Sequence, residues 1–361
     1  MPIEFAERIR RIPAYPVAAG YDLAGDVAML ASNESCFAPL PGVVEAAARA
    51  LAGANRYPDP SYWPLRRALG DRYGIAPERI ALGNGSCDIL LAAGEALLEP
   101  GAELVYAWPS FSVYPHLAAT SGARAIQVPL DARERHDLGA MAAEITVATR
   151  LVLVCNPNNP TSTARPLEEI EAFLRRVPRH VCVILDEAYC EFALALGDPY
   201  ASVELLGRHP NLVLLRTFSK VYGLAGMRVG YALCPSEDFR AAVEQVRQPF
   251  YLNVAAHAAA VEALGHQDDV ERRVTATVAG RLELEDGLRR LGLWVAESDA
   301  NFVWVRLPDG VEEPDVLDGL RLRGVLVRAG ASLGRQGAMR VTVGSDAENR
   351  RFLAALGELL G

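Results

Sequence analysis

Short apolar runs alternate with segments of helical periodicity along residues 41–234 of the chain. Runs this short and this rich in Val, Leu and Ile are typical of strands that are buried on both faces of a sheet. Helical segments between such strands favour parallel pairing, because parallel neighbours need a long crossover connection. The pattern therefore predicts an α/β fold in which a large domain, residues 41–250, holds a mostly parallel sheet flanked by helices. The predicted strands lie at residues 80–82, 104–107, 125–128, 151–155, 181–185, 212–215 and 229–233.

The remainder of the chain has a different pattern, with few apolar runs and several helical segments. Residues 268–291 form a charged helical stretch that is long enough to bridge two domains. We expect residues 1–40 and 251–361 to form a smaller α+β domain together. The first residues contain scattered prolines and little periodicity, so they are predicted to be an N-terminal arm that wraps a surface. Further strands are predicted at residues 302–306, 325–327 and 339–343, and helices at residues 315–323 and 347–360.

Composition and charge narrow the classes of partner that the protein can have. Hydrophobic residues make up 51% of the 361 residues and charged residues 22%, as in globular proteins. The net charge is −9 and no run of basic residues occurs, so neither a nucleic acid nor an anionic membrane is expected as a partner. The N-terminus has no apolar signal core, so we expect a cytoplasmic protein. Cysteines and histidines never fall at metal-ligand spacing, so no metal site is expected.

One residue type is nearly missing from the chain. Of the 36 basic residues, 35 are arginine, and Lys220 is the only lysine. A general preference for arginine explains why lysine is absent elsewhere, but it leaves open why one lysine is kept. A primary amine can lose its proton and react, and a guanidinium cannot. Lys220 is therefore a candidate for chemistry.

Polar residues directly follow three of the predicted strands. The segments are Asn-Pro-Asn-Asn-Pro-Thr at residues 156–161, Asp-Glu-Ala-Tyr at residues 186–189, and Arg-Thr-Phe-Ser-Lys at residues 216–220. Each segment alone is more often a turn or a helix cap than a functional site. In α/β folds, however, ligands bind beyond the carboxyl ends of the strands. The placement of all three segments after core strands therefore predicts one shared site.

These segments give the chain a specific family resemblance. It resembles the fold type I pyridoxal-phosphate aminotransferases, and in particular the histidinol-phosphate aminotransferase group with its relatives that act on aromatic amino acids. The resemblance runs nearly end to end, from Ala-Ser-Asn-Glu at residues 31–34 to Met-Arg-Val-Thr-Val-Gly at residues 339–344. Its most specific parts are the first two segments above and Ser-Lys-x-x-Gly-Leu-Ala-Gly-x-Arg-x-Gly-Tyr at residues 219–231. The resemblance implies pyridoxal 5′-phosphate as the cofactor.

The resemblance also implies a role for each residue around the cofactor ring. Lys220 would bind the cofactor covalently, be displaced by the substrate, and then act as the base that moves the substrate proton. Asp186 would face the pyridine nitrogen and keep it protonated. Tyr189 and Asn159 would form hydrogen bonds to the ring O3′. Phe111 matches the aromatic residue that stacks on the ring, and plain core packing is a competing explanation.

A second group of residues is expected to bind the cofactor phosphate. The segment Gly-Ser-Cys-Asp at residues 85–88 opens a helix, whose first backbone N–H groups can bind an anion. The Gly-x-Gly at its start lacks the third glycine of a dinucleotide fingerprint, and no Gly-Lys-Ser/Thr motif occurs, so nicotinamide and ATP are not expected. The predicted phosphate-binding residues are Ser86, Cys87, Thr217, Ser219 and Arg228.

The remaining site residues are implied by the resemblance alone. Tyr57 would reach the phosphate from the other subunit, which implies a homodimer with shared active sites. Arg340 and Arg328 match the anion-binding arginines of the family, and an arginine binds a carboxylate or a phosphate equally well. Tyr15 and Asn33 match positions that line the substrate end.

Several activities fit the resemblance. The first is amino transfer between histidinol phosphate and 2-oxoglutarate, a step of histidine biosynthesis, by a ping-pong reaction through pyridoxamine phosphate. The alternative is an aromatic amino-acid aminotransferase that acts on phenylalanine or tyrosine. It is supported by Ser162, where the histidinol-phosphate group usually has glycine and some aromatic aminotransferases do not. Decarboxylation of threonine phosphate and a non-catalytic, cofactor-sensing regulator rank lower, the latter because no basic helix-turn-helix precedes the matched region.

Overall fold

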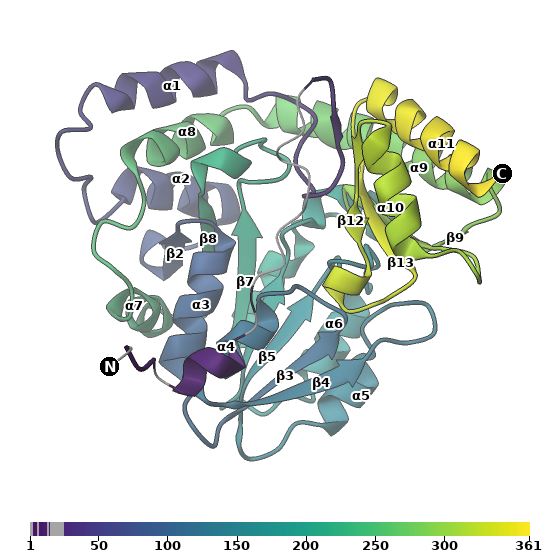
Figure 1. Ribbon diagram of the computed structural model, residues 1–361. Helices are drawn as coiled ribbons and strands as arrows, with labels where there is room; N and C mark the ends of the chain where they lie inside the picture. The colour runs from purple at the N-terminus through teal and green to yellow at the C-terminus, as the bar shows by residue number, and fades with distance from the viewer. Residues whose placement is uncertain (1–2, 6, 13, 15–24) are drawn as a thin grey trace.

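A seven-stranded sheet, called here the large sheet, lies at the centre of the computed structural model, which describes residues 3–5, 7–12, 14 and 25–361 (Figure 1). Every strand predicted within residues 80–233 is part of it, and the predicted α/β architecture is confirmed. The strand order across the sheet is β2-β8-β7-β6-β5-β3-β4. The strands are β2 (Ile80–Gly83), β3 (Glu103–Trp108), β4 (Arg124–Pro129), β5 (Thr149–Cys155), β6 (Cys182–Asp186), β7 (Leu212–Thr217) and β8 (Gly230–Leu233).

The pairing of the strands is mostly parallel, as predicted, with one exception. Strands β4, β3, β5, β6 and β7 are parallel to one another, whereas β8 is antiparallel to both β7 and β2. The chain between β7 and β8 contains only the short 3₁₀ helix η6 (Ala225–Met227) and makes no helical crossover, so the next strand returns in the opposite direction. As a result Thr217 is paired with Gly230, and the loop between them lies over the carboxyl edge of the sheet.

Consecutive residues of the central strands face opposite sides of the large sheet, and both sides are covered. Val152 and Val154 pack in one hydrophobic cluster with residues of α1, α2, α5, α6 and α8, and Leu151 and Leu153 pack in another with residues of α3, α4 and α7. Double coverage explains why the runs are apolar at every position. The edge strand β4 differs from the prediction, because most of its residues are exposed and Val128 alone is buried.

Among the helices around the large sheet, α3 to α6 lie between its strands in the chain, α1 and α2 precede β2, and α7 and α8 follow β8 (Figure 1). They are α1 (Pro41–Leu51), α2 (Trp63–Tyr73), α3 (Ser86–Leu97), α4 (Tyr114–Ser121), α5 (Leu138–Ala143), α6 (Leu167–Leu174), α7 (Glu237–Gln245) and α8 (Val254–Leu264). Short 3₁₀ helices are η1 (Glu7–Arg11), η2 (Pro77–Arg79), η3 (Cys190–Phe192), η4 (Leu194–Leu196) and η5 (Ala201–Gly207).

A four-stranded antiparallel sheet, called here the small sheet, lies beside the large one with its own hydrophobic cluster (Figure 1). The long helix α9 (Gln267–Arg290) contributes Val274 to a cluster of the large sheet and Leu284 to that of the small sheet, so it joins the two cores. The domain limits proposed from the sequence stay a prediction. The small sheet has the order β12 (Arg328–Ala329), β13 (Ala338–Thr342), β10 (Phe302–Arg306), β9 (Trp294–Val295). Around it lie α10 (Glu313–Leu322), η7 (Ala331–Leu333), α11 (Asp346–Leu360), and the parallel pair β1 (Ala28–Met29) and β11 (Val325–Leu326).

Within the described part of the chain, no helix combines the length and the apolar character that crossing a membrane requires.

Candidate active site

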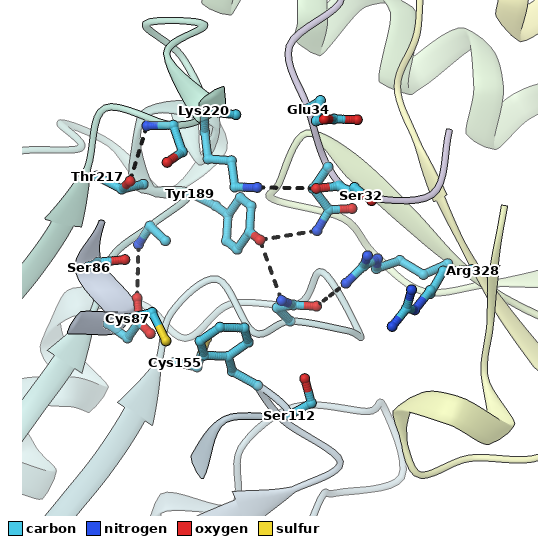
Figure 2. Close-up of a pocket in the computed structure, with 18 of the residues that line it drawn as sticks. Ser32, Glu34, Ser86, Cys87, Ser112, Cys155, Tyr189, Thr217, Lys220 and Arg328 are labelled. Atoms are coloured by element: carbon cyan, nitrogen blue, oxygen red, sulfur yellow. Dashed lines mark hydrogen bonds between the residues drawn. The ribbon is translucent and has the colours of Figure 1, made fainter. Parts of the chain in front are cut away.

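A cavity of about 370 Å³ lies at the carboxyl edge of the large sheet, where β12 and β13 of the small sheet also reach it. It brings together every site residue predicted from the sequence except Tyr15 and Tyr57. Figure 2 shows Ser86 and Cys87 on one side of this cavity and Arg328 on the other, with Tyr189 and Lys220 between them. The predicted residues that line it are Asn33, Ser86, Cys87, Phe111, Asn159, Asp186, Tyr189, Thr217, Ser219, Lys220, Arg228, Arg328 and Arg340.

The two other predicted residues are not part of the cavity lining. The side chain of Tyr57 is 80% exposed, and its ring stacks on Phe250 with 4.5 Å between the ring centroids. Tyr15 lies outside the residues that the structure describes.

Lys220 extends its amine into the cavity from the loop after β7 (Figure 2). Its Nζ donates a hydrogen bond to the backbone oxygen of Ser32 at 3.3 Å and lies 5.5 Å from the centroid of the Tyr189 ring. Burial lowers the pKa of Lys220 from its ordinary value to about 7, and the positive charges of Arg340 and Arg228 act in the same direction. Half of the amine is therefore neutral, and able to act as a nucleophile or base, near neutral pH.

The lowered pKa predicts a pH dependence that can be measured on protein freed of cofactor. Acylation of the Lys220 amine should rise with pH through about 7 and level off above about pH 8, since only the neutral amine reacts. An Arg150→Lys variant adds an exposed lysine as a control, whose acylation should keep rising beyond about pH 10. The two rates are measured by mass spectrometry of the labelled peptides. Identical pH profiles for the two lysines would contradict the prediction.

Asp186 is the last residue of β6 and is buried in the cavity wall. Its Oδ2 accepts a hydrogen bond from the Tyr114 hydroxyl at 3.0 Å, and its Oδ1 accepts one from the backbone N–H of Ala188 at 3.3 Å. Burial raises the pKa of Asp186 to about 6, because a charged carboxylate is poorly solvated there. A cationic group opposite this carboxylate would stabilise its charged form.

Tyr114 is a site residue that the sequence reasoning missed. It is fully buried, and its ring meets the Phe111 ring edge to face, at 5.7 Å between centroids and 87° between planes. A weak signal was present, because Tyr114 follows Phe111 by three residues, and in the turn that opens α4 its backbone N–H donates to the Phe111 oxygen at 2.9 Å. The hydrogen bond to Asp186 could not be anticipated, since the two residues are 72 positions apart.

Tyr189 is held in place by two asparagine side chains. Its hydroxyl accepts hydrogen bonds from Asn33 Nδ2 at 3.1 Å and from Asn159 Nδ2 at 3.4 Å, and burial raises its pKa. The Oδ1 of Asn159 in turn accepts a hydrogen bond from Arg340, whose Nη2 donates to the backbone oxygen of Ala31 at 2.7 Å. One chain of hydrogen bonds thus connects the centre of the cavity to its arginine end.

An anion-binding arrangement lies at the other end of the cavity, where α3 begins. The first N–H groups of this helix have no partner within it, and they carry the positive end of the helix dipole. Gly85 precedes the helix with a φ of 84°, and a Cβ there would lie 2.2 Å from Arg228 Nη2. The Arg228 guanidinium therefore lies against this turn, and its Nη1 donates to Ser219 Oγ at 3.4 Å. Thr217 Oγ1 accepts from the Ser219 N–H at 3.1 Å.

Arg328 and Arg340 form the opposite, second cationic end of the cavity. They are direct cross-strand partners in the antiparallel pair of β12 and β13, and both are buried. Like charges that face each other across a pair of strands repel, and an anion between them relieves that repulsion. This end of the cavity is therefore suited to a carboxylate or a phosphate.

The loop that carries Asn159 contains Ser162, the residue at which the chain departs from the usual glycine. Ser162 has a φ of 61°, in the left-handed region that favours glycine, and its backbone oxygen accepts a hydrogen bond from the Asp299 N–H at 2.8 Å. The backbone thus adopts a conformation that glycine would adopt more easily. With serine at this position, Asn159 of the same loop lines the cavity.

Comparison with known proteins decides the family. Residues 25–356 match the family model described as aminotransferase class I and II. The chain belongs to this family. Class I and II aminotransferases depend on pyridoxal phosphate, so this protein is a pyridoxal-phosphate-dependent aminotransferase.

Similar aminotransferases carry two different substrate names. An aromatic amino acid aminotransferase of Streptomyces coelicolor is 44% identical over 342 residues, which are 94% of this chain and 92% of the relative. Histidinol-phosphate aminotransferase 1 of Cupriavidus pinatubonensis is 45% identical over 339 residues, 93% of this chain and 89% of the relative. The crystal structure of the histidinol-phosphate aminotransferase of Sinorhizobium meliloti in complex with pyridoxal-5′-phosphate superposes with a TM-score of 0.84 at 29% identity, covering 99% of this chain and 97% of the other.

The residues around the cavity fit this cofactor. The aldehyde of pyridoxal phosphate binds covalently to a primary amine, and the cavity holds the only lysine of the chain. A ring nitrogen that carries a proton needs a carboxylate, and Asp186 is buried in the wall. A phosphate needs N–H donors and a cation, and the start of α3 with Arg228 supplies both. The chemistry of the donor set therefore matches pyridoxal phosphate.

Proposed function

We propose that this aminotransferase transfers the amino group of histidinol phosphate to 2-oxoglutarate, a step of histidine biosynthesis. The observation that carries the proposal is the cross-strand pair of Arg328 and Arg340, two buried guanidinium groups at one end of the cavity. A phosphate monoester carries about two negative charges near neutral pH, and two arginine forks suit it well. The same pair suits the carboxylates of 2-oxoglutarate, so donor and acceptor can use one site in turn.

We assign the cofactor-binding roles to the residues at the centre of the cavity. When bound, pyridoxal phosphate supplies an electron sink for the reaction at the substrate Cα. Asp186 holds the proton on the ring nitrogen by its charge, and Tyr114 orients that carboxylate. Tyr189 and Asn159 stabilise the ring O3′ by hydrogen bonding. Phe111 lines the cavity where a ring would stack.

Lys220 performs the proton transfer in this proposal. Its Nζ would hold the cofactor covalently, and once released by the substrate the amine would take up the proton of the substrate Cα. Its lowered pKa, about 7, keeps a usable fraction of the amine neutral at physiological pH. Backbone N–H groups of Ser86 and Cys87, with Ser219 and Arg228, bind the cofactor phosphate and fix the distance to Lys220.

Transamination of aromatic amino acids is the second candidate. It is favoured by the relatives, because the aromatic name is carried by the Streptomyces coelicolor protein and by others that are 40–45% identical. Phenylalanine brings an α-carboxylate that one arginine can bind and an uncharged ring. Both donors therefore place an anion near Arg340, and they differ in what they present to Arg328.

Removing Arg328 should separate the two candidates. Arg328→Ala should cost histidinol phosphate about 2–4 kcal/mol of transition-state binding, because a buried dianion loses a charged partner. Phenylalanine should lose less, so the ratio of kcat/KM for histidinol phosphate to kcat/KM for phenylalanine should fall by at least about tenfold. Both values are measured with 2-oxoglutarate as acceptor.

The control for this variant is Arg323→Ala, which removes an exposed arginine just before the same strands and should leave the ratio unchanged. An unchanged ratio in Arg328→Ala would remove Arg328 from the phosphate site. A wild-type enzyme that prefers phenylalanine would place the aromatic reaction first.

We further propose that the enzyme is a homodimer with shared active sites. Tyr57, implied by the family resemblance to reach the cofactor of the other subunit, lies on the surface and outside the cavity of its own chain. Its stacking on Phe250, which is 38% exposed, leaves two large rings in contact with solvent. Burial of such a surface stabilises association. Sedimentation equilibrium of the holoenzyme tests the subunit number.

A further inference from the structure

Glu134 is a buried glutamate outside the cavity lining that joins the two sheets. It lies in the turn between β4 and α5, yet its side chain is only 2% exposed. Its carboxylate accepts hydrogen bonds from both Nε, at 2.9 Å, and Nη2 of Arg306. The same Oε1 lies 3.5 Å from Nη2 of Arg335. A carboxylate held by two guanidinium groups in a buried place is a contact with little freedom to shift.

Both arginines belong to the part of the small sheet that carries the substrate-end arginines. Arg306 is the last residue of β10, and β10 pairs with β13 so that Trp304 faces Arg340. Arg335 lies between β12 and β13, within segment 328–340, which begins at one substrate-end arginine and ends at the other. Glu134 therefore contacts the turn of this segment through Arg335 and the neighbouring strand β10 through Arg306.

Segment 328–340 is also held from the side opposite Glu134. Glu313 of α10 accepts hydrogen bonds from the backbone N–H groups of Ala331, at 3.0 Å, and Gly337, at 2.7 Å. Arg306 is also fixed on its other side, because its guanidinium lies 4.2 Å from the centroid of the Trp294 ring. The segment is thus held from both sides, by Glu313 of α10 and by Glu134.

The backbone of Glu134 contacts the loop that carries Asn159, the hydrogen-bond partner of Arg340. Its carbonyl oxygen accepts hydrogen bonds from Thr161 Oγ1 at 2.8 Å and from Thr163 Oγ1 at 2.7 Å. These threonines lie in the loop of Asn159, and the Oδ1 of Asn159 accepts a hydrogen bond from Arg340. One residue therefore contacts both the Asn159 loop and the segment that carries Arg340.

The backbone of Glu134 adopts a conformation that is unfavourable for a residue with a side chain. Its φ is 62°, in the left-handed region that a residue with a side chain adopts at a cost. Such a conformation persists where the surroundings determine it from several sides. Here the carboxylate, the carbonyl oxygen and the turn N–H, which donates to the Asp131 oxygen at 2.9 Å, are all engaged.

We propose that Glu134 is a positioning residue that holds Arg328 and Arg340 in register with the Asn159 loop and so sets the affinity for the anionic end of the substrate. The inference rests on the proposed assignment of these two arginines to the substrate. An anion is bound through the geometry of the guanidinium N–H groups that face it, so a displacement of these groups weakens its binding. Loss of the Glu134 carboxylate should therefore weaken anion binding. Asp186 ends β6 of the large sheet and Lys220 lies in the loop after β7, and neither contacts Glu134, so both should keep their places.

The test is Glu134→Gln in the holoenzyme. We expect the KM for 2-oxoglutarate and the Kd of the dicarboxylate maleate, measured by calorimetry, to rise at least about fivefold, with kcat changed less than about twofold. Arg335→Ala removes one partner from the exposed side and should shift both constants in the same direction by a smaller factor. This variant decides the question if Glu134→Gln does not fold.

A matched control is Glu103→Gln, another buried glutamate that is 7% exposed and pairs with an arginine, Arg124, on a neighbouring strand. Glu103 begins β3, at the end of the strand away from the cavity, so this change should lower thermal stability and leave the Kd of maleate unchanged. Wild-type maleate affinity in both Glu134→Gln and Arg335→Ala would overturn the positioning role.

A further variant distinguishes failure of the inference from failure of the proposed function. If Arg340→Lys weakens maleate binding but Glu134→Gln and Arg335→Ala do not, the positioning role alone is wrong. If Arg340→Lys leaves maleate binding unchanged, the proposed substrate end is wrong, and the inference is overturned with it.

Discussion

Replacing Lys220 by arginine should abolish transamination while the protein still folds. The expected loss in kcat/KM is more than about 10³-fold, because a guanidinium cannot hold the cofactor covalently or act as a base at physiological pH. The chain contains no second lysine that could substitute. Activity is measured with histidinol phosphate and with phenylalanine, since the loss must be the same in kind for either donor.

The covalent link can be located in the same set of proteins. Borohydride reduction of the wild-type holoenzyme should add one cofactor mass to the peptide that contains Lys220. The Arg150→Lys variant, which has an exposed second lysine, should carry the added mass at Lys220 alone. Cofactor mass found only at the N-terminal amine, or unchanged turnover in Lys220→Arg, would refute the assignment.

Asp186→Asn should leave the cofactor bound but reduce proton abstraction at the substrate Cα by at least about a hundredfold. A neutral amide has no charge with which to keep the cofactor ring nitrogen protonated, so the electron sink is weakened. The measurement is the single-turnover rate of Cα proton exchange, together with the absorption spectrum of the bound cofactor. A rate near that of the wild type would mean that the carboxylate serves only the local structure.

Two comparisons separate the charge of Asp186 from its structural role. Tyr114→Phe removes the hydrogen bond at 3.0 Å but keeps the carboxylate, so its effect on the exchange rate should be less than about tenfold.

In cofactor-free protein the pKa of Asp186 is raised to about 6, so its neutral form favours the folded state below about pH 4, and this advantage is lost as pH rises through 6. Asp186→Asn should therefore gain thermal stability relative to the wild type between about pH 4 and 6.

Much of the fold could be predicted because the decisive pattern is local. Strands β5 and β6 are buried on both faces, and five consecutive apolar residues reveal that without knowledge of the neighbours. The edge strand β4 was expected to be buried and is largely exposed, because its run of residues does not tell how many neighbours the strand has. The antiparallel direction of β8 likewise follows from how the chain returns after Thr217, which apolar runs do not encode.

The sequence by itself determined the central strands and the residues after them that line the cavity, because strand ends in a mostly parallel sheet meet at one edge and the motifs follow those ends. Only the tertiary structure decided which side chains touch. Tyr114 reaches Asp186 across 72 positions, and Arg306 reaches Glu134 across 172. The tertiary structure also decided the lowered pKa of Lys220. The sequence supplies the amine, but burial and the neighbouring arginines set its charge. Such contacts and charges depend on distances between remote parts of the chain, and these exist only once the two sheets have packed.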